Sequence, residues 1–282
     1  MQLLSSIKIL KDCLSDWQKN QQIIALVPTM GNLHAGHLQL VRCAKKIADK
    51  VVVSIFVNPT QFVAGEDFSI YPRTIKNDLL LLEECNADIV FTPSVEEMYP
   101  TGLQGSTEIS VATLGNVFCG LYRNGHFSGV ATIVSKLLHV VQPNIALFGK
   151  KDYQQLLVIQ QLVADMFIPV EIVGVETVRE ESGLALSSRN QYLNTAQHAV
   201  AANLYKTLLG IVDAVKGGAH DFSKLEANAF EYLNNQGFKT EYLSIRNATD
   251  LGLPVSVTKE LVILVAAWLG EARLIDNIEF RR

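Results

Sequence analysis

The amino-acid sequence predicts an α/β fold, a doubly wound, Rossmann-like parallel sheet with a smaller C-terminal α+β domain. Five short apolar runs rich in Val, Ile, Leu and Phe recur along the first part of the chain, each followed by a helical pattern. The runs are almost continuously apolar rather than alternating, which is typical of strands buried on both faces. After about residue 178 the helical segments come first and strands follow. We therefore expect one domain at residues 1–178 and a second at residues 179–282.

The elements of the first domain follow from these runs. The strands are expected at residues 22–29, 50–59, 87–94, 144–150 and 170–178. The helices are expected at residues 38–48, 74–84, 129–140 and 153–166. Parallel strands need a crossover connection, which is usually a helix, so this alternation predicts helices on both faces of the sheet.

The second domain is expected to begin with a long helix at residues 194–218, which has Asn and Thr at its start and two glycines at its end. A helix at 222–235 and strands at 240–247, 261–269 and 272–280 follow, the last two joined by Gly270 and Glu271 in a hairpin-like turn. One stretch resists assignment. Residues 101–125 contain five glycines and only weak periodicity, and such a long connection is often a functional lid.

Composition limits the classes of function. With 49% hydrophobic and 18% charged residues the chain reads as a well-packed globular protein. A net charge of −4 without a basic stripe makes nucleic acid an unexpected partner, and no apolar window is long enough to predict a membrane span. The four cysteines show no C-x-x-C pair or zinc spacing, which suits a reducing compartment. We expect a cytoplasmic protein without a protein-held metal.

Polar segments follow the predicted strands. In an open α/β sheet, ligands bind beyond the carboxyl ends of the strands, so these segments are expected to share one rim. They read "PTMGNLHAGH", "NPTQF", "GKKDYQQ" and "REESGLALSSRN". Four such segments at one rim indicate a binding site more strongly than any one of them.

The first of these segments carries two histidines three residues apart, His34 and His37. A helix that begins here directs unsatisfied backbone N–H groups and a partial positive charge toward the rim. Gly31 and Gly36 allow the backbone to approach a bulky anion, and neutral imidazoles at i and i+3 can both donate hydrogen bonds to phosphate oxygens. Such donors gain strength as charge grows on phosphate in a transition state. The alternative is a pair of histidines that only cap and pack the helix start.

The other segments carry weaker signals. Lys150 and Lys151 can neutralise phosphates, and Asp152 can accept a hydrogen bond from a ribose hydroxyl. The alternative is that the two lysines are solvated and Asp152 only caps the next helix. The residues of "LALSSRN" supply hydroxyl donors and a guanidinium suited to a triphosphate, or they form an ST turn. Gln61 and Gln155 offer both donor and acceptor groups, as needed to hold a small hydroxy acid. His126 is expected to be structural.

Together these stretches resemble a known family. The segments "VPTMGNLHAGH", "SIFVNPTQF", "YPRT", "FGKKDYQQL" and "LALSSRN" are similar to the signatures of the pantothenate synthetase, or pantoate–β-alanine ligase, family, and "ILVAAWLGEARLIDN" resembles its C-terminal strands. That family belongs to the H-x-G-H nucleotidyltransferases. The likeness runs through nearly the whole chain. It implies an ATP-dependent ligase that joins pantoate to β-alanine through a pantoyl adenylate and releases AMP and pyrophosphate, a homodimer, and MgATP as co-substrate.

The resemblance also implies residue roles. His37, His34 and Lys151 would be catalytic, with His37 as proton donor. Gln61 and Gln155 would orient pantoate, with Gln61 near the β-alanine amine. ATP would be bound from the first domain and its junction with a C-terminal cap by a larger set that includes the three catalytic residues: Met30, Gly31, Asn32, Leu33, His34, Ala35, Gly36, His37, Gly149, Lys150, Lys151, Asp152, Val178, Leu186, Ser187, Ser188 and Arg189.

Two positions depart from the family pattern. Lys150 stands where the family commonly has a glutamate, and its charge is expected to favour phosphate binding. Asn124 stands where a proline is common, which puts the rigidity of the lid in question, while Arg123 is expected to reach the phosphates on closure. Two other functions remain open at this point: a nucleotidylyltransferase that leaves the nucleotide on its product, and a nucleotide-sensing module without catalysis.

Overall fold

The computed structural model describes residues 1–282, and the chain divides into two compact units. Unit 1 comprises Met1–Lys150 and Gln154–Glu176, and unit 2 comprises Lys151–Tyr153 and Thr177–Arg282. None of the helices is both long enough and apolar enough to span a membrane.

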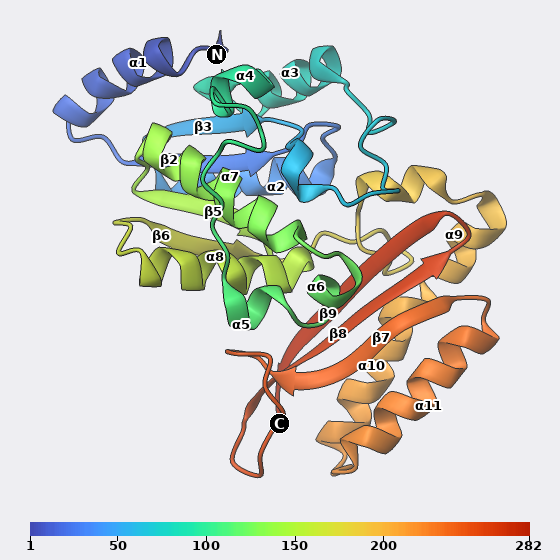
Figure 1. Cartoon of the computed structure of the whole chain (residues 1–282). Helices are drawn as coiled ribbons and strands as arrows, with labels where there is room; N and C mark the ends of the chain where they lie inside the picture. The colour runs from blue at the N-terminus through green and yellow to red at the C-terminus, as the bar shows by residue number, and fades with distance from the viewer. The chain divides into compact units, whose positions relative to one another are not determined.

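Unit 1 contains a six-stranded, fully parallel sheet in the order β1-β4-β3-β2-β5-β6 (Figure 1). Its strands are β1 (Gln2–Leu4), β2 (Ile24–Thr29), β3 (Lys50–Ile55), β4 (Ile89–Phe91), β5 (Ile145–Gly149) and β6 (Glu171–Val175). Its helices are α1 (Ile7–Lys19), α2 (Ala35–Ile47), η1 (Pro59–Gln61), α3 (Ile75–Glu84), α4 (Val95–Met98), α5 (Ala112–Gly115), α6 (Cys119–Tyr122), α7 (His126–Val141) and α8 (Tyr153–Asp165).

Helices cover both faces of this sheet, because the strands are apolar on both. Alternate residues of β2 enter different cores: Ile24 and Leu26 pack with α1, α7 and α8, whereas Ala25 and Val27 pack with α2 and α3. This confirms the predicted doubly wound α/β fold and the five predicted strands. The edge strand β1 was not predicted, because three residues are too short to show a period.

Residues 101–125, which showed little periodicity, contain only the single turns α5 and α6. One side chain attaches this segment to the rest of unit 1 through three hydrogen bonds. Gln154 donates to the carbonyl oxygens of Leu114 and Val117, each at 2.7 Å, and accepts from the amide of Cys119 at 3.1 Å. Gln154 is buried, and these three bonds hold the segment together with a bond from the amide of Ile109 to the hydroxyl of Thr132 at 2.9 Å.

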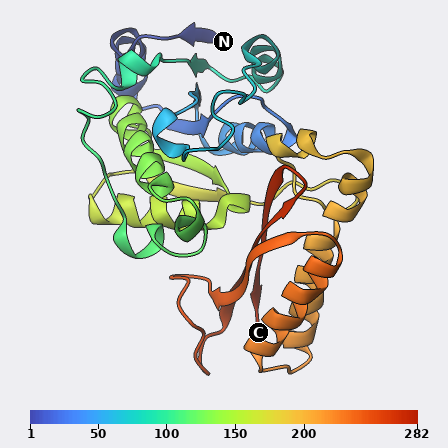
Figure 2. The ribbon, with the colours of Figure 1, turned by 45° about the vertical axis from the view of Figure 1, so that its right-hand side comes forward.

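Unit 2 is an α+β arrangement, as predicted. An antiparallel sheet of β7 (Lys239–Asn247), β8 (Glu260–Leu269) and β9 (Ala272–Arg281) has the β8–β9 hairpin that Gly270 and Glu271 predicted. Figure 2 shows α10 (Asn203–Lys216) and α11 (Phe222–Asn235) side by side against this sheet. The long helix expected at 194–218 is wrong in one respect: it is divided at Ala202 into α9 (Thr195–Ala201) and α10.

Candidate active site

The strand order identifies where a ligand is expected in unit 1. From β2 the chain continues to β3 on one side, while β5 and then β6 lie on the other side of β2. In such sheets the crevice beyond the carboxyl ends of the two strands at this reversal is the usual binding position. The segment Met30–His37, called the histidine loop below, follows β2, and Gly149 and Lys150 lie at the end of β5.

The histidine loop ends in a reciprocal cap at the start of α2. His34 is the N-cap residue, and its Nδ1 accepts a hydrogen bond from the amide of Gly36 at 3.1 Å. The Nδ1 of His37 accepts from the amide of His34 at 3.3 Å. An imidazole nitrogen that accepts from an amide carries no proton, so in each neutral ring the proton is on Nε2. The cap therefore gives both histidines a donor at Nε2.

The two rings lie close together over the helix start. Their centroids are 4.1 Å apart with an interplanar angle of 38°. A Cβ on Gly36 would lie 2.9 Å from the Cε1 atom of His34, so only glycine allows this imidazole to fold over the first turn. The first turn of α2 itself has no acidic residue. An anion at this position would meet two ring donors and the helix terminus.

Gln61 lies at the end of η1, after β3, and its side-chain amide is oriented by Asn58. The hydroxyls of Tyr99 and Thr60 donate to Oδ1 of Asn58 at 2.7 and 3.1 Å. The amide nitrogen of Asn58 therefore faces the other way and donates to Oε1 of Gln61 at 3.3 Å and to the carbonyl of Gly129 at 3.1 Å. Burial raises the pKa of Tyr99, which keeps its hydroxyl protonated as a donor.

The other end of the Gln61 amide faces the histidine loop. Its Nε2 lies 2.8 Å from the sulfur of Met30. Gln61 and the histidine loop are thus neighbours within unit 1, as the sequence predicted for a common rim. Asn58 was not predicted as a site residue, although it stands three residues before Gln61 in the quoted segment "NPTQF". Tyr99 carried no sequence signal, because it reaches Asn58 from a distant part of the chain.

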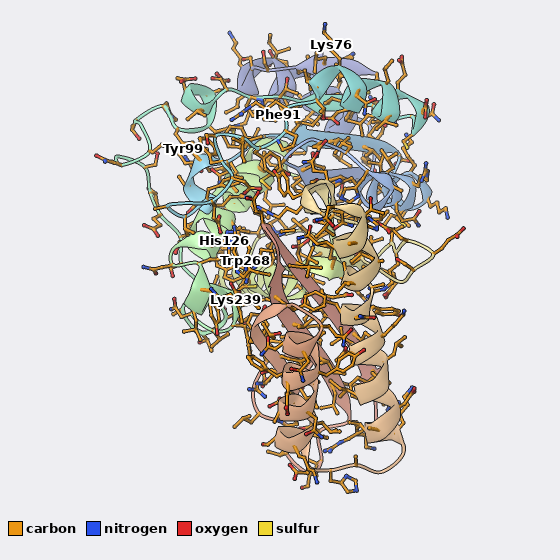
Figure 3. All side chains as sticks on the ribbon, turned by 90° about the vertical axis from the view of Figure 1, so that its right-hand side faces the viewer. Lys76, Phe91, Tyr99, His126, Lys239 and Trp268 are labelled. Atoms are coloured by element: carbon orange, nitrogen blue, oxygen red, sulfur yellow. The ribbon has the colours of Figure 1, made fainter.

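His126 is buried and structural, as expected, and it also contacts Gln61. Arg123 donates to Nε2 of His126 at 2.8 Å. Because a guanidinium can only donate, Nδ1 of His126 carries the proton and donates to the backbone carbonyl of Gln61 at 2.6 Å. Arg123 also pairs with Glu66, with Nη2 2.8 Å from Oε2. Arg123, which was expected to reach the phosphates on closure, is thus held between His126 and Glu66. The positions of His126 and Tyr99 are labelled in Figure 3.

The residues after β5 are less constrained. The ammonium of Lys150 lies 2.6 Å from a carboxylate oxygen of Glu176, an exposed side chain, so the charge expected to favour phosphate has an acidic neighbour. Gln155 is half-buried in the first turn of α8, one residue after Gln154. Gln155 therefore follows β5, which is the neighbour of β2 at the reversal of strand order. It makes no hydrogen bond with Gln61.

The remaining predicted residues belong to unit 2. Lys151 and Asp152 are close, with Nζ 3.9 Å from Oδ1, and the carbonyl of Lys151 accepts from Asn277 at 2.8 Å. The amide of Leu186 donates to the carbonyl of Val178 at 3.0 Å, which brings together two predicted positions eight residues apart. Ser187 accepts from the amide of Arg189 at 3.2 Å, which is the ST turn considered above.

Comparison with known proteins agrees with the resemblance. Residues 2–279 match the protein family described as pantoate-beta-alanine ligase. The pantothenate synthetase of Shewanella woodyi is 50% identical over 276 residues, covering 98% of this chain and 98% of that protein. The pantothenate synthetase of Chromohalobacter salexigens is 51% identical over 278 residues, covering 99% and 98%.

Solved structures lead to the same family. A pantothenate synthetase from Thermus thermophilus is 44% identical with a TM-score of 0.93, and the comparison covers 100% of both chains. A pantoate-beta-alanine ligase from Francisella tularensis, complexed with beta-gamma ATP and beta-alanine, is 37% identical with a TM-score of 0.83 over 99% of this chain and 97% of that chain. Both the sequence and the fold are matched along their whole length. The chain therefore belongs to the pantoate–β-alanine ligase family.

Proposed function

We propose that the chain condenses (R)-pantoate with β-alanine to form pantothenate, using MgATP through a pantoyl-adenylate intermediate. Ligation follows from membership of the family. The observation that carries the chemistry is the reciprocal cap of His34 and His37, which gives two Nε2 donors at the N-terminus of α2. This position adjoins the reversal of strand order, where α/β sheets bind ligands.

In the first step an oxygen of the pantoate carboxylate attacks the α-phosphorus of ATP. The new bond joins that oxygen to phosphorus, the bond between the α-phosphorus and the bridging oxygen breaks, and pyrophosphate leaves. Charge accumulates on the phosphate oxygens, and fixed donors that face them are worth more in the transition state than in the ground state. We assign this role to His34 and His37, with Lys151 as a further cation.

In the second step the amine of β-alanine attacks the acyl carbon of the adenylate. A C–N bond forms, the C–O bond to AMP breaks, and the amine loses a proton. An amine cannot displace oxide from a free carboxylate, whereas AMP is a good leaving group, so activation is required. The adenylate is open to hydrolysis, and a segment that excludes water, such as residues 101–125, protects it.

Pantoate binding is assigned to Gln61 and Gln155. The Asn58 contact fixes the amide of Gln61 with its oxygen toward Asn58 and its NH2 group toward the histidine loop. This pre-orientation supports a donor role toward the hydroxy acid, because a fixed amide loses little side-chain entropy on binding. For Gln155 the support is its position in the first turn of α8 and the resemblance.

ATP binding is assigned to two sets of residues. In unit 1 they are the histidine loop, Gly149 and Lys150. In unit 2 they are Lys151 for phosphate, Asp152 for the ribose hydroxyls, Val178, and the run Leu186, Ser187, Ser188 and Arg189. We propose that residues 1–178 form the ATP- and pantoate-binding domain and residues 179–282 a cap. The pairing between Val178 and Leu186 supports treating those two positions as one group.

Three further assignments complete the proposal. Mg²⁺ enters on the phosphates of ATP, and the chain has no cluster of three His, Cys, Asp or Glu side chains that could hold a metal. The active form is a homodimer, for which the support is the family resemblance. The enzyme works in the cytoplasm, consistent with four cysteines that form no disulfide.

Isotope-traced product analysis tests the function. ATP, pantoate and β-alanine are added singly, in pairs and together, and AMP, pyrophosphate and pantothenate are measured. We expect pyrophosphate with ATP and pantoate alone, and AMP with pantothenate only when β-alanine is added. A stable adenylylated product that forms whether or not β-alanine is present would instead establish a nucleotidylyltransferase. If no product formed with any combination of substrates, the chain would be a nucleotide-sensing module. The names of the relatives support ligation.

A further inference from the structure

A buried carboxylate on α3 holds the histidine loop by its backbone. Asp78 is 1% exposed, and its Oδ2 accepts from the amide of Asn32 at 3.0 Å. Its Oδ1 accepts from the amide of Leu33 at 2.9 Å and from the hydroxyl of Thr74 at 3.1 Å. A buried carboxylate needs such partners, and here two of the three donors belong to the residues immediately before His34.

The backbone of the loop is shaped for this carboxylate. Gly31 has φ +81° and Asn32 has φ +49°, so two successive residues adopt the left-handed conformation. Consecutive amides in such a turn converge on an anion, and for Asn32 the conformation costs free energy that the two charge-assisted bonds offset. A Cβ on Gly31 would lie 3.1 Å from Oδ2 of Asp78, so a side chain at this position would crowd the carboxylate.

A hollow lies beside the loop on this side. A cavity of about 370 Å³ is lined by Met30 and Gly31, by Thr74 and Asp78 on the α3 side, and by apolar residues that include Ile55. The loop is also held by the buried side chain of Leu33, which packs in the core with α2, and by the amide of Gly31, which donates to the hydroxyl of Thr29 at 3.2 Å. On the α3 side, the two hydrogen bonds to Asp78 are the polar contacts that position residues 32 and 33.

We propose that Asp78 is a positioning residue that sets where His34 and His37 meet the triphosphate. We assign it no direct contact with ATP, pantoate or β-alanine; it acts through the amides of Asn32 and Leu33. The inference rests on the proposed function, because the effect on catalysis presumes that these histidines face ATP. An error of about 1 Å in such a position can lower a rate about 100-fold.

Asp78→Asn is a specific test of this role. The substitution keeps size and shape but replaces one oxygen with an NH2 group. Because both oxygens of Asp78 accept from loop amides, either orientation of the new amide directs its nitrogen toward a backbone N–H. The hydrogen bond from the amide of Asn32 or of Leu33 is lost, and two N–H donors then face each other and repel. We therefore expect the histidine loop to move.

Asp88→Asn is the matched control. Oδ2 of Asp88 accepts from the amide of Val51 at 2.8 Å and from Lys45 at 2.9 Å. The substitution therefore breaks the same kind of carboxylate–backbone bond in the same unit. It does so at the amino ends of β3 and β4, the opposite edge of the sheet from the histidine loop. Any effect of lost stability is shared by both variants, whereas an effect on the loop belongs to Asp78 alone.

The assay is pantoate-dependent exchange of label between pyrophosphate and ATP, with thermal unfolding measured in parallel. For Asp78→Asn we expect kcat of exchange to fall about 10- to 100-fold with little change in the KM for pantoate. Asp88→Asn should exchange at close to the wild-type rate. A folded Asp78→Asn enzyme as active as Asp88→Asn would overturn the proposal. Thr74→Val, which removes only the third donor, should show a smaller fall in kcat, and if Asp78→Asn does not fold, a wild-type rate for Thr74→Val overturns the proposal instead.

A second readout separates this inference from the function. In the protein without substrates, the ¹⁵N resonances of the His34 and His37 imidazoles should shift in Asp78→Asn and not in Asp88→Asn. If the wild-type enzyme showed no exchange, the proposed function would fail while this comparison still decided whether Asp78 positions the histidines. Unchanged imidazole resonances in Asp78→Asn would contradict the positioning role, whatever the exchange assay gave.

Discussion

Single hydrogen bonds determine what each side chain in this site can offer a substrate. The amide of His34 donates to Nδ1 of His37, and the amide of Gly36 donates to Nδ1 of His34. In each neutral ring the proton is therefore on Nε2. At the neighbouring turn, the Asn58 amide fixes the orientation of Gln61. In both cases a residue with two possible states, tautomer or amide flip, is confined to one by a neighbour. Both states can be tested by substitution.

The first prediction concerns His37. His37→Ala removes the Nε2 donor and also the acceptor for the His34 amide. The phosphate oxygens then lose one hydrogen bond that would stabilise their charge in the transition state. Loss of one such donor costs about 10²–10³ in rate. Pantoate-dependent pyrophosphate release should fall by at least that factor, with far-ultraviolet circular dichroism unchanged. His220→Ala, at an exposed position in unit 2, is the control. Near wild-type release by the His37 variant would remove the histidine from the mechanism.

The second prediction concerns Gln61. Gln61→Ala should raise the KM for pantoate about 10-fold or more, because a hydrogen bond to a charged substrate is worth about 1.5–3 kcal/mol. The KM for ATP should change much less. Gln160→Ala, an exposed glutamine on α8, should leave both constants near wild type. Equal changes in the two KM values for the Gln61 variant would show that this residue does not orient pantoate.

The sequence predicted these residues unevenly. His34, His37 and Gln61 stand next to predicted strand ends, where polar side chains are conspicuous after an apolar run. Asp78 gave no signal, because an acidic residue on an amphipathic helix reads as part of the solvent face. In the structure it is buried by a loop 45 residues earlier in the chain, a contact that local pattern cannot reveal.

At the scale of elements, α7 and η1 touch through their backbones. Gly129 lies in the first turns of α7, and its carbonyl accepts from Asn58 at 3.1 Å. A Cβ at Gly129 would overlap the carbonyl of Thr60 and lie 2.7 Å from the Cα of Gln61. Helix and turn can approach this closely only because residue 129 has no side chain.

Gly129→Ala is therefore expected to push α7 away from η1. Overpacking of this kind costs about 1–3 kcal/mol of unfolding free energy, and the displaced Gln61 should raise the KM for pantoate. Gly210→Ala makes the same change at an exposed position in the middle of α10, where a Cβ would meet no other atom. It should raise the free energy of unfolding by about 0.5–1 kcal/mol. Denaturant unfolding measures both. A Gly129→Ala enzyme as stable as wild type would show that the contact is not tight.

Among the elements, most long helices and apolar strands were predicted, although the 13-residue helix α1 (Ile7–Lys19) was not, and several other failures concern very short elements. β1 has three residues, and α5 and α6 have four residues each, which is too short for a period to appear. The division between α9 and α10 occurs at Ala202, a residue that favours helix, so composition gave no sign of it.

At the scale of the whole molecule, two apolar cores on the two faces of the parallel sheet stabilise unit 1 and a third core stabilises unit 2. Buried tyrosines link that stability to pH. In unit 2, the hydroxyl of Tyr153 donates to a carboxylate oxygen of Glu279 at 2.8 Å and lies 2.9 Å from the carbonyl oxygen of Ala248. Burial, followed by the hydrogen bond and charge of Glu279, raises the pKa of Tyr153 well above its usual value. In unit 1, burial also raises the pKa of Tyr99.

These shifts predict a loss of stability in alkali. A folded-state pKa above the unfolded value of 10.0 means that the stabilising contribution is complete below pH 10 and is lost as pH rises further. Urea unfolding should therefore show a steeper loss above pH 10 in wild type than in Tyr153→Phe, which has no group to ionise there. Tyr232 is an exposed tyrosine of α11, so the free energy of unfolding of Tyr232→Phe should fall above pH 10 as steeply as that of wild type. Parallel losses for Tyr153→Phe and wild type would contradict the linkage.

The proposed mechanism requires the histidine loop to face the triphosphate. The most direct measurement is a crystal structure of the protein with pantoate and a non-hydrolysable ATP analogue. We predict phosphate oxygens within hydrogen-bonding distance of Nε2 of both His34 and His37, with Nδ1 of each ring still accepting from the backbone amides that cap α2. A triphosphate bound away from the histidine loop, or imidazoles that turn Nδ1 toward it, would contradict the account.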